Sequence, residues 1–353
     1  MKSQKYHIPD RQSIDKGSET QDFRDHFVES NKVTFDFAQK VEIYLLNFYW
    51  IAIIVIVNCM TLSLDLSKNS MRNSICLVTN KGGGKSTLLI RILALNNLDF
   101  FTILPKKVFE SLLLEKGSEY FNNKIIVHDD LIIAFTGLNE KQLSQLLGFF
   151  TSLLSDKSYS RQDREVKADC LCMFGVALEH MQKFRKVMDL ATFTDRVPFV
   201  LKSYSDEEKR KTLKYNKQEI PAIKLPLTQT KTKILLKLTP EMEVDIEDIC
   251  MQLDSFGIMS WKRAQSHIHN FLMANALLNK RKETNIHDLT LFKKVLPFYL
   301  DSIGMSHVML LNKAIAENPE KKDTELMKIL GWTKATFYRT KSKLKGLRYG
   351  EST

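Results

Sequence analysis

The sequence contains little cysteine, and none of it is arranged as a zinc-binding motif. The 353 residues include five cysteines, and no two of them show CxxC spacing. An odd number of cysteines in mostly apolar surroundings favours a reducing compartment over a disulfide scaffold, so we expect a cytoplasmic protein. Internal repeats and low-complexity tracts are also missing, which argues against a repeat architecture.

The chain lacks a recognisable signal peptide, because its amino-terminal segment is long and polar. Acidic residues are in deficit: 52 Lys and Arg oppose 41 Asp and Glu, which gives a net charge of +11. This balance favours an anionic partner, either nucleic acid or an acidic membrane surface, but says nothing about the fold. Hydrophobic residues make up 44% of the chain, which is enough for a sizeable core in two or three domains.

Residues 43–64 form an uncharged run that includes the sequence FYWIAIIVIV. The run is long enough to span a bilayer. Against a membrane helix, Asn47 and Asn58 interrupt it and β-branched residues crowd its centre. We favour a buried core helix, with a membrane anchor as the less favoured alternative.

Residues 75–93 have the pattern of a strand, a glycine-rich turn and a helix. The apolar run ICLV precedes TNKGGGKST, which is followed by LLIRIL. Amides of such a loop and the positive end of its helix cradle phosphate oxygens, while Lys85 reaches the β- and γ-phosphates and Ser86 ligates Mg²⁺. We therefore expect ATP and Mg²⁺ as cofactors. The residues expected to bind the nucleotide are Gly82, Gly83, Gly84, Lys85, Ser86 and Thr87.

One position departs from the phosphate-loop pattern G-x-x-x-x-G-K-[ST]. Thr79 stands where the first glycine belongs, and a β-branched residue resists the positive φ that glycine adopts easily. The departure suggests a site that hydrolyses slowly or binds nucleotide as a switch.

An apolar run at residues 124–128 ends in two acidic residues. In a triphosphatase, one carboxylate at such a strand end holds Mg²⁺ through water and the next polarises the attacking water. We assign these roles to Asp129 and Asp130. The spacing from Lys85 leaves room for a helix, a strand and another helix, so we predict that the acidic strand lies next to the strand of the phosphate loop.

Strand-like and helix-like segments alternate through residues 75–201, which predicts a mostly parallel sheet with helices on both faces. Residues 203–237 are basic and less periodic, as in a connection. Three helices are then expected at residues 244–253, 260–278 and 286–300. Residues 1–35 show no clear period, and we expect a polar arm that is disordered or loosely docked.

The order of these features resembles the AAA+ ATPases, in particular the branch of minichromosome-maintenance-like and mobile-element helicase proteins, over about residues 40–300. The resemblance implies a P-loop α/β core with a helical lid, assembled as a homo-oligomer such as a hexameric ring. The segment TFTDRVPF at 192–199 resembles the stretch that carries the arginine finger, which nominates Arg196 for the γ-phosphate of a neighbouring subunit. SWKRA at 260–264 resembles the start of a lid helix and nominates Arg263 as a second catalytic arginine.

This sequence departs from the family pattern at two further places. The family normally has glutamate where Asp130 stands, and a polar residue at the end of the fourth strand. The segment LCMFGVA at 171–177 offers no such polar residue. Both departures fit slow hydrolysis.

The last fifty residues have the pattern of a helix-turn-helix, winged or plain. A short helix at 322–330 is followed by Gly331-Trp332 and a second, basic helix at 334–347. Cations on that helix would contact DNA phosphates, and polar groups near its start would contact base edges. A basic amphipathic helix that docks on protein or lipid is the alternative. The residues expected to bind DNA are Lys334, Thr336, Tyr338, Arg339, Lys341 and Lys343.

The sequence thus predicts four parts: a polar arm (1–35), an AAA+-like ATPase core (36–236), a helical lid (237–302) and a small helix-turn-helix domain (303–353). The expected function is an ATP-dependent DNA-binding motor or remodelling ATPase, helicase-like or an initiator or loader, of a plasmid, virus or mobile element. One alternative is a nucleotide-regulated DNA-binding protein with a degraded ATPase site. Another is a partition-type ATPase, because KGGGKST at 81–87 falls one residue short of the deviant loop K-G-G-x-G-K-[ST].

Overall fold

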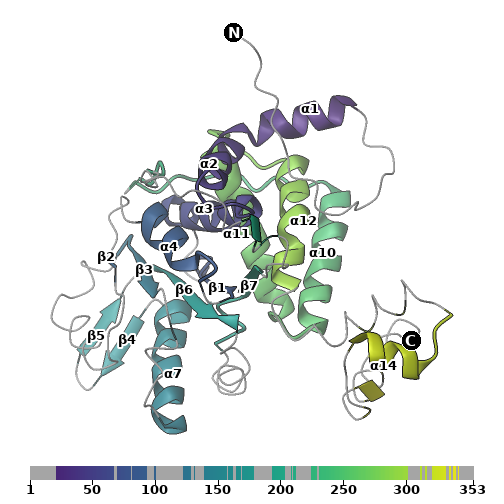
Figure 1. The fold of residues 1–353 in the computed structure, drawn as a ribbon. Helices are drawn as coiled ribbons and strands as arrows, with labels where there is room; N and C mark the ends of the chain where they lie inside the picture. The colour runs from purple at the N-terminus through teal and green to yellow at the C-terminus, as the bar shows by residue number, and fades with distance from the viewer. Residues whose placement is uncertain are drawn as a thin grey trace.

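The chain has an α/β fold in which a parallel sheet is covered by helices (Figure 1). The computed structural model describes residues 21–66, 70–80, 82–93, 99–100, 122–128, 131, 139–156, 158–161, 164–167, 169–178, 193–202, 208, 210–211, 224–228, 230–300, 311, 315, 320–330, 334, 337–338 and 341.

The sheet has five strands in the order β2-β3-β6-β1-β7, and every neighbouring pair is parallel. Strands β1, β3 and β6 are buried along their whole length, as expected for a parallel sheet with both faces covered. The strands are β1 (Ile75–Thr79), β2 (Asp99–Phe100), β3 (Ile125–His128), β6 (Leu171–Ala177) and β7 (Phe199–Lys202).

Helices lie on opposite faces of this sheet, which confirms the alternation seen in the sequence. Helix α4 (Lys85–Leu93) contacts β1, β3 and β6 on the face that also carries α2 and α3 in Figure 1. Helix α7 (Glu140–Asp156) lies on the other face, where the Phe150 ring packs edge-on against Phe174 of β6. An antiparallel hairpin of β4 (Ser158–Arg161) and β5 (Arg164–Lys167) follows α7, and the sequence analysis did not anticipate it.

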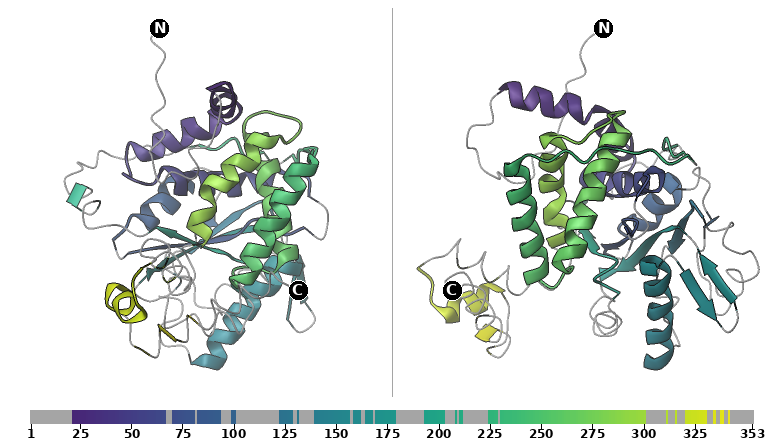
Figure 2. Two further views of the ribbon diagram at one scale, coloured as in Figure 1. Left: turned by 90° about the vertical axis from the view of Figure 1, so that its right-hand side faces the viewer. Right: turned by 180° about the vertical axis from the view of Figure 1, so that it is seen from behind.

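Three helices follow the sheet, as predicted: α10 (Pro240–Ser255), α11 (Trp261–Leu278) and α12 (Ile286–Leu300). The Thr239 hydroxyl accepts a hydrogen bond from the Met242 amide at 3.3 Å, so Thr239 caps α10. The Asn285 side chain accepts one from the His287 amide at 3.0 Å at the start of α12. Because α12 contacts β7 and α11 contacts α3, the helical layer packs directly on the core (Figure 2).

The uncharged run proves to be a core helix. All residues of α3 (Tyr49–Met60) are buried, and the helix packs between α2 and α11. At 1.5 Å per residue this 12-residue helix is about 18 Å long, well short of the roughly 30 Å hydrocarbon layer. Among the described residues, no helix is both long and apolar enough to cross a membrane.

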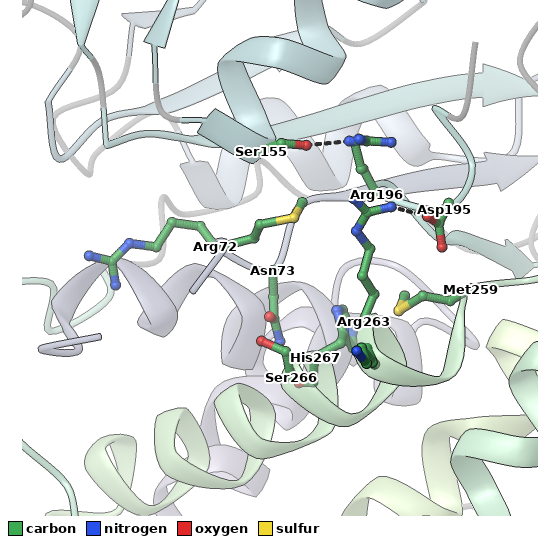
Figure 3. A pocket seen from close by; sticks show the side chains of 11 residues that line it. Arg72, Asn73, Ser155, Asp195, Arg196, Met259, Arg263, Ser266 and His267 are labelled. Carbon is green, nitrogen blue, oxygen red and sulfur yellow. Dashed lines mark hydrogen bonds and ion pairs between the residues drawn. The ribbon is translucent and has the colours of Figure 1, made fainter. Parts of the chain in front are cut away.

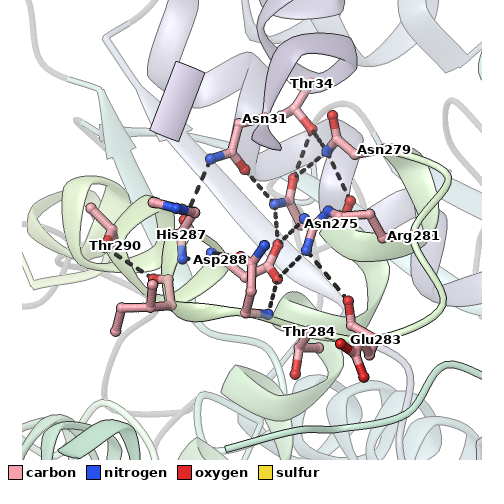
Figure 4. A network of polar contacts seen from close by, with 12 residues as sticks. Asn31, Thr34, Asn275, Asn279, Arg281, Glu283, Thr284, His287, Asp288 and Thr290 are labelled. Atoms are coloured by element: carbon pink, nitrogen blue, oxygen red, sulfur yellow. Dashed lines mark hydrogen bonds and ion pairs between the residues drawn. The ribbon is translucent and has the colours of Figure 1, made fainter. Parts of the chain in front are cut away.

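Residues 21–35 differ from the polar arm that was expected. They belong to α1 (Gln21–Ser30) and α2 (Lys32–Glu42), and Phe27 and Phe35 are buried in the main core. Two of their polar residues, Asn31 and Thr34, are buried and bond to α11: Thr34 donates to the Asn275 side chain at 2.7 Å (Figure 4). The polar composition was therefore misleading, because partners more than 200 residues away bond to the two buried polar side chains, Asn31 and Thr34. Residues 1–20 lie outside the described residues.

The same polar network continues into α12. The Asn275 amide donates to both Asn31 and Asp288 at 2.6 Å, and Asp288 is paired with Arg281 at 2.5 and 2.8 Å (Figure 4). Asn275 and Asp288 are completely buried. A buried network of this kind favours one arrangement of the packed helices, here that of α1 and α2 against α11 and α12.

Helix α14 (Asp323–Leu330) has a small core of its own. Leu311, Leu326 and Phe337 form this cluster. The described residues after α14, which are Lys334, Phe337, Tyr338 and Lys341, are all helical, in agreement with a second helix. The rest of the expected helix-turn-helix lies outside the described residues, so that motif stays a prediction.

Candidate functional site

The glycine-rich loop joins β1 to α4, as the sequence predicted. Strand β1 ends at Thr79 and α4 begins at Lys85. Gly82 and Gly84 adopt φ values of +73° and +87°, a left-handed conformation that side chains with a Cβ rarely adopt. The Gly84 carbonyl then accepts the Leu88 amide at 2.9 Å, so the first helical turn forms directly after the glycines.

Thr79 does not need the conformational freedom of glycine. It is the last residue of β1, completely buried and extended, where a β-branched side chain is favourable. The positive φ values fall at Gly82 and Gly84 instead. The departure from the sequence pattern at Thr79 therefore causes no backbone strain in this loop.

The middle of the loop is tightly constrained. A Cβ added at Gly83 would lie 2.7 Å from the Asn80 carbonyl oxygen and 2.9 Å from the Thr79 hydroxyl. The Asn80 carbonyl also accepts a hydrogen bond from the Gly83 amide at 2.8 Å. This hydrogen bond keeps the carbonyl in the position where it would clash with a Cβ at residue 83. Only glycine fits at this position without movement of the loop.

The segment between α2 and α3 packs against the loop, and sequence reasoning missed it. A Cβ at Gly84 would lie 3.4 Å from Leu45 and 3.5 Å from Phe48. The Glu42 carboxylate holds this segment by accepting the amides of Asn47, Phe48 and Tyr49, each at 2.7 Å. Burial raises the pKa of Glu42, although these hydrogen bonds and the charge of Lys202 act in the opposite direction. Nothing in the local sequence links Glu42 to a loop some forty residues away.

Two lysines lie at the carboxyl end of the sheet. Lys85 is largely buried at the start of α4, and no described residue forms an ion pair with its ammonium group. Lys202 is level with Thr79 on the neighbouring strand and pairs with Glu208 at 3.2 Å. Lys202 is thus partly neutralised, while Lys85 directly follows the glycine-rich loop, whose amides could bind an anion.

The acidic strand is not adjacent to the strand of the phosphate loop, contrary to our prediction. β3 pairs with β2 and β6, and β6 lies between β3 and β1. Neighbouring strands are about 4.8 Å apart, so β3 is roughly 10 Å from β1. Parallel strands end at the same edge of a sheet, and β3 ends at His128, directly before Asp129 in the sequence. Asp129 and Asp130 themselves lie outside the described residues.

His128 at the end of β3 is a packing residue. Its ring stacks on Phe174 at 5.6 Å and meets Phe150 edge-on at 5.2 Å. Burial lowers the pKa of His128 to about 4, so the imidazole is neutral at physiological pH. It anchors the end of β3 to its neighbours.

Within the described residues, no group of three or more His, Cys, Asp or Glu side chains could hold a metal ion. Mg²⁺ does not require such a group, because it commonly keeps several waters and takes one or two protein oxygens together with phosphate oxygens. The Ser86 hydroxyl, in the first turn of α4, is an oxygen of this kind. Ser86 and Asp129 therefore remain a suitable pair of ligands by their chemistry.

The two arginines nominated from the family resemblance lie at the amino-terminal ends of the strands, whereas the phosphate loop lies at their carboxyl ends. Asp195 and Arg196 precede β7, and Arg263 lies in the first turn of α11. The Arg196 guanidinium donates to the Ser155 hydroxyl, and Arg263 pairs with Asp195 (Figure 3). The structure thus brings both arginines together, but not with this chain's own phosphate loop. A contact from Arg196 to the nucleotide of a neighbouring subunit stays a prediction.

These side chains line a pocket of about 320 Å³ between the sheet and α11, which we call the core–lid pocket. Arg72 and Asn73, directly before β1, form one side of it (Figure 3). Arg72 makes two bonds to Asp169, at 2.9 and 2.5 Å, and His267 forms part of the lining. Sequence reasoning singled out Arg196 and Arg263 separately and gave no sign that they share one pocket.

The carboxyl-terminal residues expected to bind DNA are described in part. Lys334 and Tyr338 are exposed. Lys341 forms an ion pair with Asp323 of α14 at 2.5 and 2.6 Å, which holds the second helical segment against the first. Thr336, Arg339 and Lys343 lie outside the described residues.

No family model matches the chain, and no curated protein matches it in sequence. The function is therefore argued from the geometry of the site and from the chemistry of its residues.

Proposed function

We propose that the protein is an ATP-dependent DNA-binding ATPase of AAA+-like architecture, which acts as a helicase-like motor or as an initiator or loader for a plasmid, virus or mobile element. The observation that carries the proposal is the loop between β1 and α4, with left-handed glycines at 82 and 84 and a largely buried Lys85 at the helix start. This arrangement has the amides, the helix dipole and the cation that a triphosphate requires.

In this proposal, amides of the loop and Lys85 bind the β- and γ-phosphates. Ser86 and Asp129 would hold Mg²⁺, which when bound neutralises the phosphate charge. Because β6 lies between β1 and β3, the carboxyl ends of β1 and β3 are about two strand spacings apart. This separation gives room for a phosphate and its attacking water between Lys85 and the acidic residues, which supports the assignment. Asp130 would polarise the attacking water, and Arg196 of another copy would stabilise the charge that develops.

The main alternative is a DNA-binding protein that binds nucleotide without hydrolysing it. It is favoured by β6, whose buried residues from Leu171 to Ala177 place no acidic, basic or amide side chain at the middle of the site. Such a protein would respond to nucleotide through binding alone.

Steady-state ATP turnover with and without DNA separates the two functions. For the proposed ATPase, we expect DNA to raise turnover at least several-fold, because a motor or loader couples hydrolysis to its nucleic-acid partner. Tight nucleotide binding with no turnover under either condition would support the regulator and contradict the ATPase. A chain with Lys85 replaced by alanine provides the background rate.

Deletion of residues 305–353 is expected to weaken DNA binding and to flatten its dependence on salt. Each phosphate contact that is lost lowers the slope of log affinity against log salt by about 0.9. Fluorescence anisotropy with a labelled duplex between low and moderate salt measures this slope. Asp323→Asn is a useful companion, because it releases Lys341 and should steepen the slope. An unchanged slope after deletion would place DNA binding elsewhere on the protein.

A further inference from the structure

The turn between α2 and α3 forms a nest of backbone amides that is filled by the chain's own carboxylate. One oxygen of Glu42 accepts the Asn47 amide, and the other accepts the amides of Phe48 and Tyr49, each at 2.7 Å. Asn47 has a φ of +66°, a left-handed conformation that asparagine adopts more readily than other residues with a Cβ. Successive amides around a left-handed residue make a concavity that binds anions. Here the anion is Glu42, the last residue of α2.

Glu42 also caps α3 from a distance. Phe48, the residue before α3, makes no side-chain cap hydrogen bond of its own. The first amides of a helix have no acceptor within the helix, and a negative charge is favourable at this positive end. The Glu42 carboxylate supplies both the acceptor and the charge, so it fixes where α3 begins and how the Phe48 backbone is oriented.

The closed turn presents apolar side chains to the glycine-rich loop. A Cβ added at Gly84 would lie 3.4 Å from Leu45 and 3.5 and 3.6 Å from two ring atoms of Phe48. Phe48 is completely buried, and Gly84 has a φ of +87° and directly precedes Lys85. The Phe48 ring therefore limits how far Gly84 can move, and Glu42 holds the backbone that carries this ring.

Glu42 is linked to the start of the loop as well. Burial raises the pKa of Glu42, whereas the three amides and the positive charge of Lys202 act to lower it. Lys202 is almost completely buried at the end of β7, level with Thr79, where β1 passes into the loop. The charge of Glu42 is thus stabilised from the sheet on one side and from the α3 amides on the other.

We infer that Glu42 is a positioning residue for nucleotide binding, which holds Phe48 against Gly84 and so keeps the loop between β1 and α4 in the conformation that receives a phosphate. This inference rests on the proposed function, because it assumes that the loop binds a nucleotide. When only a fraction of the molecules has a competent site, the apparent affinity falls by that fraction. Loss of Glu42 therefore weakens binding although Glu42 itself does not touch the nucleotide.

Glu42→Gln is the first test. The substitution keeps the size of the side chain but replaces one acceptor oxygen by an amino group, which would face a backbone N–H. We expect affinity for an ATP analogue, measured by calorimetry, to fall by about tenfold, because the competent fraction of the loop falls. In the nucleotide-free chain, hydrogen exchange should become faster at the amides of residues 82–86 and stay unchanged in β6.

Asp288→Asn is the matched control. Asp288 is also a carboxylate that accepts a backbone amide, from Asn285 at 2.8 Å, and a side-chain amide, from Asn275 at 2.6 Å. It belongs to the network at the amino end of α2, whereas Glu42 is at the carboxyl end. This variant should lower the melting temperature but leave the analogue affinity within about twofold, as expected for a separate site. An equal loss of affinity in both variants would mean that general destabilisation is the cause, and would overturn the inference.

Phe48→Leu tests whether Glu42 acts through the ring. It should weaken analogue binding, and the double variant with Glu42→Gln should bind about as weakly as the weaker single variant, because both changes remove one contact. Fully additive losses, or normal affinity in Glu42→Gln, would overturn the inference. Lys85→Ala separates the two proposals. If it loses affinity while Glu42→Gln does not, only the role of Glu42 is wrong; if it keeps its affinity, the proposed function and this inference fail together.

Discussion

Nucleotide binding is expected to be lost when Lys85 is replaced by alanine. The ammonium group is largely buried at the start of α4, and no described residue is an ion-pair partner for it. Its charge is therefore available to a phosphate, and a charge-assisted contact of this kind contributes about 1.5–3 kcal/mol. We expect affinity for an ATP analogue, measured by calorimetry, to fall by about tenfold to more than a hundredfold.

Lys233→Ala is the matched control for Lys85→Ala. Lys233 is exposed, so its removal changes the net charge equally without altering the loop. If both variants bind the analogue like the unmodified protein, the loop between β1 and α4 is not a phosphate site. The ATPase proposal would then fail.

Gly83→Ala should reduce nucleotide binding by at least about tenfold while leaving the fold intact. The added methyl group would lie 2.7 Å from the Asn80 carbonyl, a backbone atom that cannot move away without shifting the loop. Overpacking of this kind costs about 1–3 kcal/mol, and the displaced amides would no longer converge on a phosphate. Calorimetry with the ATP analogue measures the effect, and thermal melting shows that the chain still folds.

Gly148→Ala distinguishes this local clash from a general intolerance of alanine. Gly148 lies within α7, and an added Cβ has no heavy atom within 4 Å. This substitution should stabilise the protein by up to about 1 kcal/mol, because alanine favours a helix more than glycine does. It should leave nucleotide affinity unchanged. Normal affinity in Gly83→Ala would mean that the loop geometry does not determine binding.

Local sequence was sufficient for the elements whose signal lies within a few residues. The glycine-rich loop was found because its pattern is contiguous, from the apolar run before Thr79 to the helix after Lys85. The three helices after residue 239 were found from their periodicity and from caps such as Thr239. Each of these signals reflects backbone conformations and hydrogen bonds formed between near neighbours.

Arrangements that depend on partners distant in sequence were predicted less well. The order of strands was wrong at β3, because strand pairing is decided by how crossover helices pack and not by the order of strands along the chain. Residues 21–35 were expected to be a polar arm, because the hydrogen-bond partners of Asn31 and Thr34 are Asn275 in α11 and Asn279 at its end, more than 200 residues away.

The sequence by itself determined the existence of the phosphate-loop pattern, the α/β alternation, the three helices after residue 239 and the strongly basic charge. Only the tertiary structure decided that the long apolar run is a buried helix, that Glu42 holds a segment against the loop, and that Arg196 and Arg263 share one pocket away from it. The physical reason is that conformation follows local geometry, whereas burial and the grouping of charges follow from packing between residues far apart in the chain.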